Sequence, residues 1–124
     1  MNLPLVLYVD DEPDALISLK AGLEDRGFEV ATAPSGEKAL EWLASHEPNL
    51  ILADLRMQPM NGFEFFQQVR KISKFSGIPF FFLTAVDDSL ARRYGRTLGV
   101  DAYITKPIDL ENLDTLIKEK LARK

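Results

Sequence analysis

The sequence has no cysteine among its 124 residues and a single histidine, His46. Disulfide scaffolds and cysteine-based metal sites are therefore excluded, and we interpret His46 as a surface residue near a helix end. No apolar stretch approaches the roughly 18 residues of a membrane span. The N-terminus also lacks a basic region followed by a signal-peptide core. We expect a soluble, cytoplasmic protein with no membrane association.

An excess of positive charge is also missing. Lys and Arg total 15 against 19 Asp and Glu, which gives a formal net charge of -4 and disfavours direct binding of nucleic acid. No Pro/Gly/Ser-rich linker, low-complexity tract or sequence repeat divides the chain. Its length and its 46% hydrophobic content predict one compact domain over residues 1–124.

Short apolar runs alternate with segments of helical periodicity along the whole chain. Five helices are predicted. The first runs from Pro13 to before Gly27, and the second runs from the N-cap Ser35 to before Pro48, with Leu40, Leu43 and Ala44 on its inner face. The third starts at Gly62, the fourth runs from Asp87–Ser89 to Gly99, and the fifth covers Leu110–Leu121. The predicted strands are Leu5–Val9, Phe28–Ala33, Leu50–Asp54, Ile78–Leu83 and Ala102–Thr105. Unbroken apolar strands between helices predict an α/β fold: a parallel sheet of five strands, doubly wound with helices on both faces.

Polar residues follow four of the predicted strands. Parallel strands share one direction, so these residues gather at one edge of the sheet, where open α/β sheets bind ligands. At about 5 Å and an effective dielectric near 20, each pair of carboxylates would repel by about 3 kcal/mol. A hard divalent cation resolves this conflict, and an all-oxygen ligand set favours Mg²⁺. The residues concerned are Asp10, Asp11, Glu12, Asp54, Thr84 and Lys106.

A carboxylate beside Mg²⁺, a lysine and a hydroxyl is typical of phosphoryl transfer. We interpret Asp54 as the nucleophile because it stands alone on its strand, whereas Asp10 and Asp11 are paired as metal ligands would be. Thr84 and Lys106 would neutralise the transferred oxygens. For Asp54 taken alone, the alternative is a simple cap of the turn that follows it.

The chain resembles the receiver domains of two-component response regulators over nearly its whole length. The motifs that carry the resemblance are Val9-Asp10-Asp11-Glu12, Asp54 with Met57-Gln58-Pro59-Met60-Asn61-Gly62, Leu83-Thr84-Ala85, and Asp101-Ala102-Tyr103-Ile104-Thr105-Lys106-Pro107. The resemblance implies a flavodoxin-like fold with strand order 2-1-3-4-5, an order that flavodoxin shares with a chemotaxis regulator of this family.

The resemblance also implies the site chemistry. Asp54 would accept phosphate from a phosphohistidine, and Thr84 and Lys106 would contact the phosphoryl group. Mg²⁺ would be bound by Asp11, Asp54 and the backbone carbonyl of Arg56, with Asp10 acting largely through bound water. The peptide bond between Lys106 and Pro107 would be cis.

The resemblance further implies a switch in a signalling protein that is not an enzyme beyond its own phosphorylation and slow autodephosphorylation. Phosphorylation would draw Thr84 inward, and Tyr103 would follow. This movement would alter the face formed by the fourth helix, last strand and last helix, where a downstream effector protein or output domain binds. The phosphate donor would be a sensor histidine kinase or a histidine phosphotransfer protein. The chain would be a monomer or a phosphorylation-dependent dimer.

One departure from the family pattern lies next to Asp54. Gln58 stands where the family usually has proline, and Pro59 comes one position later, which makes the backbone geometry of this loop less constrained.

Three other classes of function remain to be weighed. A Mg²⁺-dependent phosphohydrolase would need a substrate cap for which 124 residues leave no room. A nucleotide-binding flavodoxin-like protein would need a phosphate-binding loop that is missing. An unphosphorylated binding module would not need the full set of acids, Thr84 and Lys106. Whether the receiver stands alone or was excised from a larger regulator or hybrid kinase is left open by the sequence.

Overall fold

The structure of the protein is a computed structural model that describes residues 2–122. In this range five strands and five α-helices alternate along the chain, with one short 3₁₀ helix after α3. The strands are β1 (Leu5–Val9), β2 (Glu29–Ala33), β3 (Leu50–Ala53), β4 (Phe80–Thr84) and β5 (Ala102–Thr105). The helices are α1 (Pro13–Glu24), α2 (Gly36–Leu43), α3 (Gly62–Arg70), α4 (Ser89–Leu98) and α5 (Leu110–Ala122), and the 3₁₀ helix is Ser73–Phe75.

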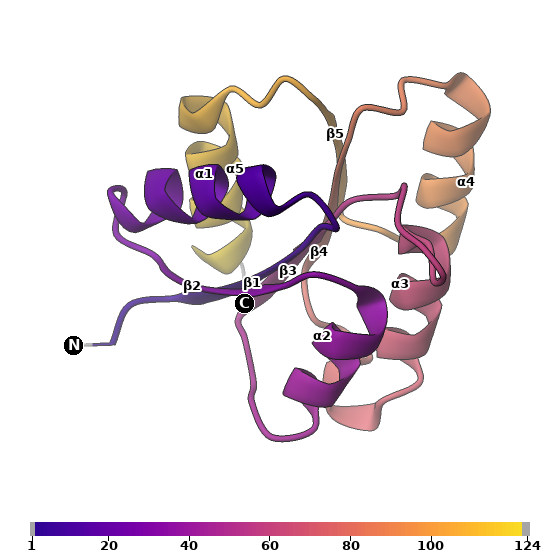
Figure 1. Ribbon diagram of the computed structural model, residues 1–124, viewed down its shortest axis with the longest axis horizontal. Helices are drawn as coiled ribbons and strands as arrows, with labels where there is room; N and C mark the ends of the chain where they lie inside the picture. Colours follow the sequence, from indigo (N-terminus) through magenta and orange to yellow (C-terminus); the bar gives the residue numbers. More distant parts are fainter. Residues whose placement is uncertain (1, 123–124) are drawn as a thin grey trace.

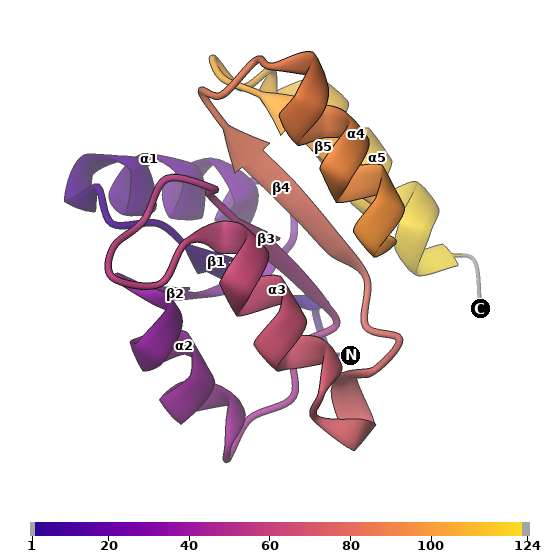
Figure 2. The same ribbon diagram turned by 90° about the vertical axis from the view of Figure 1, so that its right-hand side faces the viewer.

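The strands form one parallel sheet in the order β2-β1-β3-β4-β5. Helices α1 and α5 cover one face, and α2, α3 and α4 cover the other (Figures 1 and 2). The predicted fold class and strand order are therefore confirmed. In the register of the sheet, Val9 of β1 lies between Ala33 and Ala53, so the strands that flank β1 end level with it.

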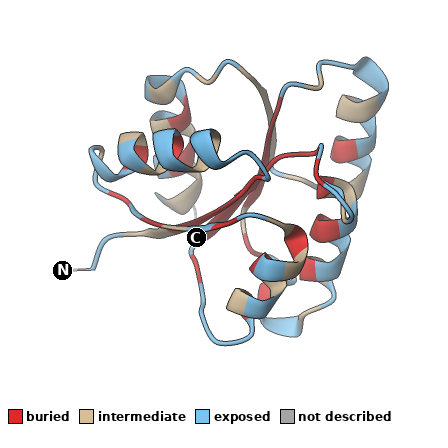
Figure 3. Cartoon of the chain, in the orientation of Figure 1, coloured by how far each residue is buried: buried red, intermediate tan, exposed pale blue. Residues whose placement is uncertain are grey.

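Two apolar cores lie on the two faces of the sheet, because successive side chains of a strand point to opposite faces. In β1, Leu7 and Val9 belong to the core under α2, α3 and α4, whereas Val6 and Tyr8 belong to the core under α1 and α5. Burial is continuous along the central strands (Figure 3). Each fully buried large apolar side chain contributes about 1.5–3 kcal/mol, so these cores fix the positions of the strand ends.

Local sequence signals account for most of the helix ends. Ser35 caps α2 as predicted, accepting from the backbone N–H of Lys38. Asn61 and Glu64 form a reciprocal capping box at the start of α3. Asp88 caps α4, which ends at Gly99 with a left-handed φ of 92°, a conformation that glycine adopts without steric cost.

Several details of the sequence prediction are wrong. Strand β3 ends at Ala53, one residue before the predicted Asp54. Strand β4 starts at Phe80 and includes Thr84, since Pro79 has no N–H to donate to the ladder. Strand β2 starts one residue later than predicted, at Glu29. Ala44 is exposed and ends α2 instead of lying on its inner face. The 3₁₀ helix Ser73–Phe75 was not predicted, because a single turn has no periodicity to detect.

The end of the sheet away from Asp54 is held together by Asp101. Its carboxylate accepts from the backbone N–H of Phe80 at 2.8 Å and pairs with Lys120 of α5 at 2.8 Å. It also lies 3.9 Å from the guanidinium of Arg70 at the end of α3. Arg70 in turn donates to the carbonyl of Ile78 at 2.8 Å. These contacts join α3, β4, β5 and α5.

Across residues 2–122, none of the helices has the length and apolar character needed to span a bilayer.

Candidate functional site

Three polar side chains are buried at the carboxyl ends of the central strands. Asp10 and Thr84 have no exposed area, and Asp54 is 5% exposed. The backbone N–H of Asp10 donates to Ala33 and that of Asp54 donates to Val9, so each acid continues the ladder directly beyond its strand. The sheet therefore delivers both carboxylates to one edge, as the sequence predicted.

The turn after β3 orients the carboxylate of Asp54. Its Oδ1 accepts from the backbone N–H of Leu55 at 2.7 Å and from that of Arg56 at 3.4 Å. Gly62 lies so close to this turn that a Cβ there would be 2.8 Å from the Cα of Leu55 and closer still to the carbonyl oxygen of Asp54. Absence of a side chain at Gly62 therefore permits the turn that presents Asp54.

Asp10 is held by three protein donors. Its Oδ2 accepts from the hydroxyl of Tyr8 at 2.5 Å and from the ammonium of Lys106 at 2.9 Å. Its Oδ1 accepts from the backbone N–H of Glu12 at 3.1 Å. A buried carboxylate needs such partners, because burying an unpaired charge is costly. Burial, followed by the hydrogen bond to Asp10, raises the pKa of Tyr8 above its ordinary value.

Lys106 lies between the two buried acids. Its Nζ is 2.9 Å from Oδ2 of Asp10 and 3.5 Å from Oδ2 of Asp54. The peptide bond that follows it is cis, as the resemblance implied. Burial alone would lower the pKa of Lys106, but the hydrogen bond to Asp10 and the charges of Asp54, Asp10 and Glu12 together raise it. The ammonium therefore remains charged and offsets part of the repulsion between the acids.

Three carboxylates come together in the described part of the chain. Oxygens of Asp10, Glu12 and Asp54 lie within 4.8 Å of one another. Asp11 is exposed and lies outside this group, beside Arg56 and Gln58 at the rim of a hollow of about 500 Å³. An all-oxygen donor set with more carboxylates than the single Lys106 can neutralise fits a hard divalent cation.

The remaining predicted residues line the loop between β4 and α4. Oγ1 of Thr84 accepts from the backbone N–H of Val86 at 3.2 Å. The hydroxyl of Tyr103 donates to the carbonyl of Val86 at 2.6 Å. Arg92 of α4 lies over the Tyr103 ring, 4.9 Å from its centroid, and pairs with Asp87 at 3.1 Å. Thr84 and Tyr103 are thus linked through the same loop residue.

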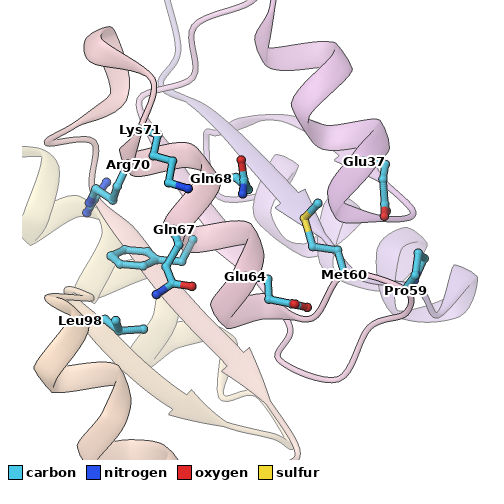
Figure 4. A pocket seen from close by; sticks show the side chains of 10 residues that line it. Glu37, Pro59, Met60, Glu64, Gln67, Gln68, Arg70, Lys71 and Leu98 are labelled. Carbon is cyan, nitrogen blue, oxygen red and sulfur yellow. The ribbon is translucent and has the colours of Figure 1, made fainter.

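The loop with the displaced proline contains a second cis peptide, between Gln58 and Pro59. Pro59 and Met60 line a hollow of about 650 Å³ along the outer surface of α3, with Glu64, Gln68 and Lys71 (Figure 4). None of the buried acids lines it. It is separate from the site around Asp54.

Sequence reasoning missed one participant in the site and gave another no specific role. Glu12 was recognised as an acid at the strand end, but the ligand roles were assigned to Asp10 and Asp11, which are paired in the sequence. Tyr8 was read only as part of an apolar strand. Its alternation with Asp10, two positions later on the same face of the strand, is a signal that could have placed its hydroxyl near that carboxylate.

The fold and the site together define a doubly wound α/β protein with a cluster of carboxylates and a lysine at the carboxyl edge of its sheet. The family model described as the response regulator receiver domain matches residues 6–118. The chain belongs to the response regulator receiver domain family. It is thereby a signalling domain of the phosphate-accepting kind found in two-component systems.

Individual relatives agree with this assignment. The chain is similar to response regulator Rre1 of Synechocystis sp., with 37% identity over 119 residues that make up 95% of this chain and 52% of Rre1. It is similar to protein PilH of Pseudomonas aeruginosa, with 33% identity over 94% of this chain and 97% of PilH. The chain thus spans about half the length of Rre1 and nearly all of PilH.

A solved structure shows the same fold. The response regulator receiver domain protein (CheY-like) from Methanospirillum hungatei JF-1 matches with a TM-score of 0.89 and 31% identity, covering 98% of this chain and 95% of that one.

Proposed function

We propose that Asp54 accepts a phosphoryl group in a Mg²⁺-dependent transfer, and that this phosphorylation switches a protein-interaction surface. The observation that carries the proposal is the position of the Asp54 carboxylate, which lies almost buried, 3.5 Å from the ammonium of Lys106 and within 4.8 Å of two further carboxylates. A nucleophile, a cation and a cation-binding cluster then share one crevice, which is the arrangement phosphoryl transfer requires.

The two oxygens of Asp54 have different surroundings. Oδ1 accepts two backbone N–H groups, whereas Oδ2 faces Lys106. We assign Oδ2 as the attacking oxygen because a phosphoryl group bonded there would have its own oxygens within reach of the ammonium. In the transfer, Oδ2 forms a bond to phosphorus while the bond from phosphorus to the donor's imidazole nitrogen breaks. The nitrogen keeps the electron pair of that bond.

Residues at two strand ends, those of β1 and β3, would hold the metal. The resemblance assigns Asp11, Asp54 and the backbone carbonyl of Arg56 as ligands, with Asp10 acting through water, and the observed cluster adds Glu12 to this set. When bound, Mg²⁺ supplies charge neutralisation for the acids and for the phosphoryl oxygens. Lys106 and the hydroxyl of Thr84 complete that neutralisation from the β5 and β4 ends.

Thr84 and Tyr103 would transmit the effect of phosphorylation from Asp54 to the protein surface. A phosphoryl oxygen that accepts from the hydroxyl of Thr84 would pull on the loop that also holds Val86. Tyr103 is bonded to Val86 and would move with it. The face of α4, β5 and α5 would then change shape and bind a downstream effector protein or output domain.

The phosphate donor would be a sensor histidine kinase or a histidine phosphotransfer protein. Nucleic acid would not be a direct partner, given the net charge of -4. The oligomeric state would be a monomer or a phosphorylation-dependent dimer, and the domain would occupy residues 1–124 in the cytoplasm.

The test is to incubate the protein with Mg²⁺ and acetyl phosphate and to measure its intact mass. We expect one added phosphoryl group in wild type, none in Asp54→Ala, and a normal yield in Asp25→Ala, a control at an exposed position of α1's end. An equal yield of phosphoprotein in Asp54→Ala would refute the assignment.

A further inference from the structure

Tyr8 is a tyrosine in the middle of the apolar core beneath α1 and α5. Its side chain is 1% exposed and packs in the same core as Leu19 and Leu83. Its hydroxyl donates to Oδ2 of Asp10, the shortest of the contacts that the acid makes. A tyrosine hydroxyl buried at this depth, aimed at a carboxylate of the phosphoryl-transfer site, is more than a packing group.

Oδ2 of Asp10 is shared between two donors, Tyr8 and Lys106. The other oxygen, Oδ1, accepts the backbone N–H of Glu12. Asp10 has no exposed area, so bulk water has little access to replace a donor that leaves. Any displacement of Lys106 would therefore leave Tyr8 as the remaining protein donor to Oδ2.

The ammonium of Lys106 compensates the charge of two acids. In this structure its ammonium is closer to Asp10, at 2.9 Å, than to Asp54, at 3.5 Å. A phosphoryl group on Asp54 adds negative charge and acceptor oxygens on that side, so the ammonium would shift toward it. This shift weakens the contact with Asp10 at the moment when the transferred oxygens need the positive charge.

We infer that Tyr8 is a positioning residue for phosphoryl transfer: its hydroxyl holds the Asp10 carboxylate in place and compensates its charge while Lys106 moves from Asp10 toward the phosphoryl group on Asp54. This inference rests on the proposed function of Asp54. Tyr8 itself touches neither the phosphate nor the metal in this scheme.

The hydroxyl has two separable effects on the site. Without it, Asp10 holds Lys106 more tightly, so that transfer becomes slower. At the same time the charge of the acid cluster is unchanged but is compensated by one hydrogen bond fewer, so that its attraction for a divalent cation does not fall. Tyr8→Phe is therefore expected to slow phosphoryl transfer without weakening Mg²⁺ binding. General damage to the core would both slow the transfer and weaken Mg²⁺ binding.

The experiment compares wild type, Tyr8→Phe and the matched control Tyr94→Phe, whose side chain is 45% exposed on α4. Phosphorylation by acetyl phosphate is followed by intact mass at saturating Mg²⁺, and binding of Mg²⁺ alone by calorimetry. We expect Tyr8→Phe to be phosphorylated about tenfold more slowly, the order of effect of one charge-assisted hydrogen bond. Its Kd for Mg²⁺ should not rise, and Tyr94→Phe should match wild type in both measurements.

A double-mutant cycle with Asp10→Asn separates positioning from packing. If the hydroxyl acts through Asp10, Tyr8→Phe should cause no further slowing in the Asp10→Asn background. Equal slowing in both backgrounds, an unchanged or faster rate in Tyr8→Phe, or a parallel loss of Mg²⁺ binding and melting temperature would each overturn the inference. Absence of phosphorylation in wild type would instead overturn the proposed function.

Discussion

Gly62 is the residue whose missing side chain matters most for the geometry of the site. Its backbone N–H donates to the carbonyl of Leu55 at 2.9 Å, which draws the start of α3 against the end of β3. Since a Cβ would collide with backbone atoms of Asp54 and Leu55, no rotation of a neighbouring side chain could relieve the contact.

We expect Gly62→Ala to destabilise the protein by about 1–3 kcal/mol, the usual cost of overpacking, and to slow phosphorylation of Asp54 by displacing its backbone. Urea unfolding and intact mass measure the two effects. The matched control is Gly77→Ala, because a Cβ at Gly77 would meet nothing within 4 Å. Equal stability of the two variants would contradict this view of the turn.

The raised pKa values of Tyr8 and Lys106 predict how the free energy of unfolding depends on pH in the alkaline range. The pKa of each is raised in the folded protein, so above the unfolded values of about 10 to 10.5 the unfolded chain releases protons that the folded chain retains. The stability contributed by these groups is complete below pH about 10 and is lost as the pH rises through their raised folded pKa values, at no more than about 1.4 kcal/mol per pH unit for each group.

Urea unfolding between pH 9 and 11 tests this expectation. Wild type should lose stability as the pH rises, and Tyr8→Phe should lose it less steeply, because one of the two groups is absent. Identical slopes of the free energy of unfolding against pH in the two proteins would show that the Tyr8 hydroxyl has the same pKa in the folded and the unfolded state.

At the level of single residues, the sequence predicted which residues follow the strands but not how their side chains are oriented. Asp10, Asp54, Thr84 and Lys106 lie at one edge of the sheet because the parallel strands that carry them share one direction. Asp11 and Glu12 are both exposed, but only Glu12 joins the cluster, and this difference depends on the path of the chain into α1. The hydrogen bond from Tyr8 depends on side-chain rotamers that periodicity does not specify.

Among the elements, α4 is the least firmly packed. Gly95 is its only buried residue, whereas α3 buries Phe65, Phe66 and Val69. Leu90 is 69% exposed. At Gly95 the helix approaches the sheet closely, since a Cβ there would lie 3.3 Å from Val100 and 3.5 Å from Tyr103. Little apolar burial therefore opposes a shift or local opening of α4.

Native-state hydrogen exchange should show this difference between helices. We expect the amides of α4 to exchange about tenfold or more faster than those of α3, because local opening costs less where few apolar contacts are broken. Equal protection of the two helices would contradict the interpretation.

Helices and strands were mostly predictable from the sequence, because capping residues and apolar periodicity agree along the chain. The exceptions are short-range: the start of β4 at Phe80 depends on Pro79, and the 3₁₀ helix Ser73–Phe75 is one turn long. The weak packing of α4 was not predicted, since Leu90 and Tyr94 keep helical spacing without being buried.

For the whole molecule, we expect the acid cluster to make the free energy of unfolding depend on divalent cations. Mg²⁺ that binds only the folded state should raise the free energy of unfolding by about 2.7 kcal/mol at 100 times its Kd. Thermal melting with increasing Mg²⁺ measures this gain, a chelator should reverse it, and Asp10→Asn should reduce it. A melting temperature indifferent to Mg²⁺ would argue against a metal at this edge of the sheet.

Asp101 gives the two ends of the sheet different mechanical roles. Its contacts with Phe80, Arg70 and Lys120 anchor α3 and α5 to the sheet at the end opposite Asp54, and α4 makes none of these contacts. We therefore expect a displacement that begins beside Asp54 to reach α4 and the adjoining loop more readily than α3 or α5. On this view the domain is a rigid frame with one compliant element, and a signal would emerge on a single side of the molecule.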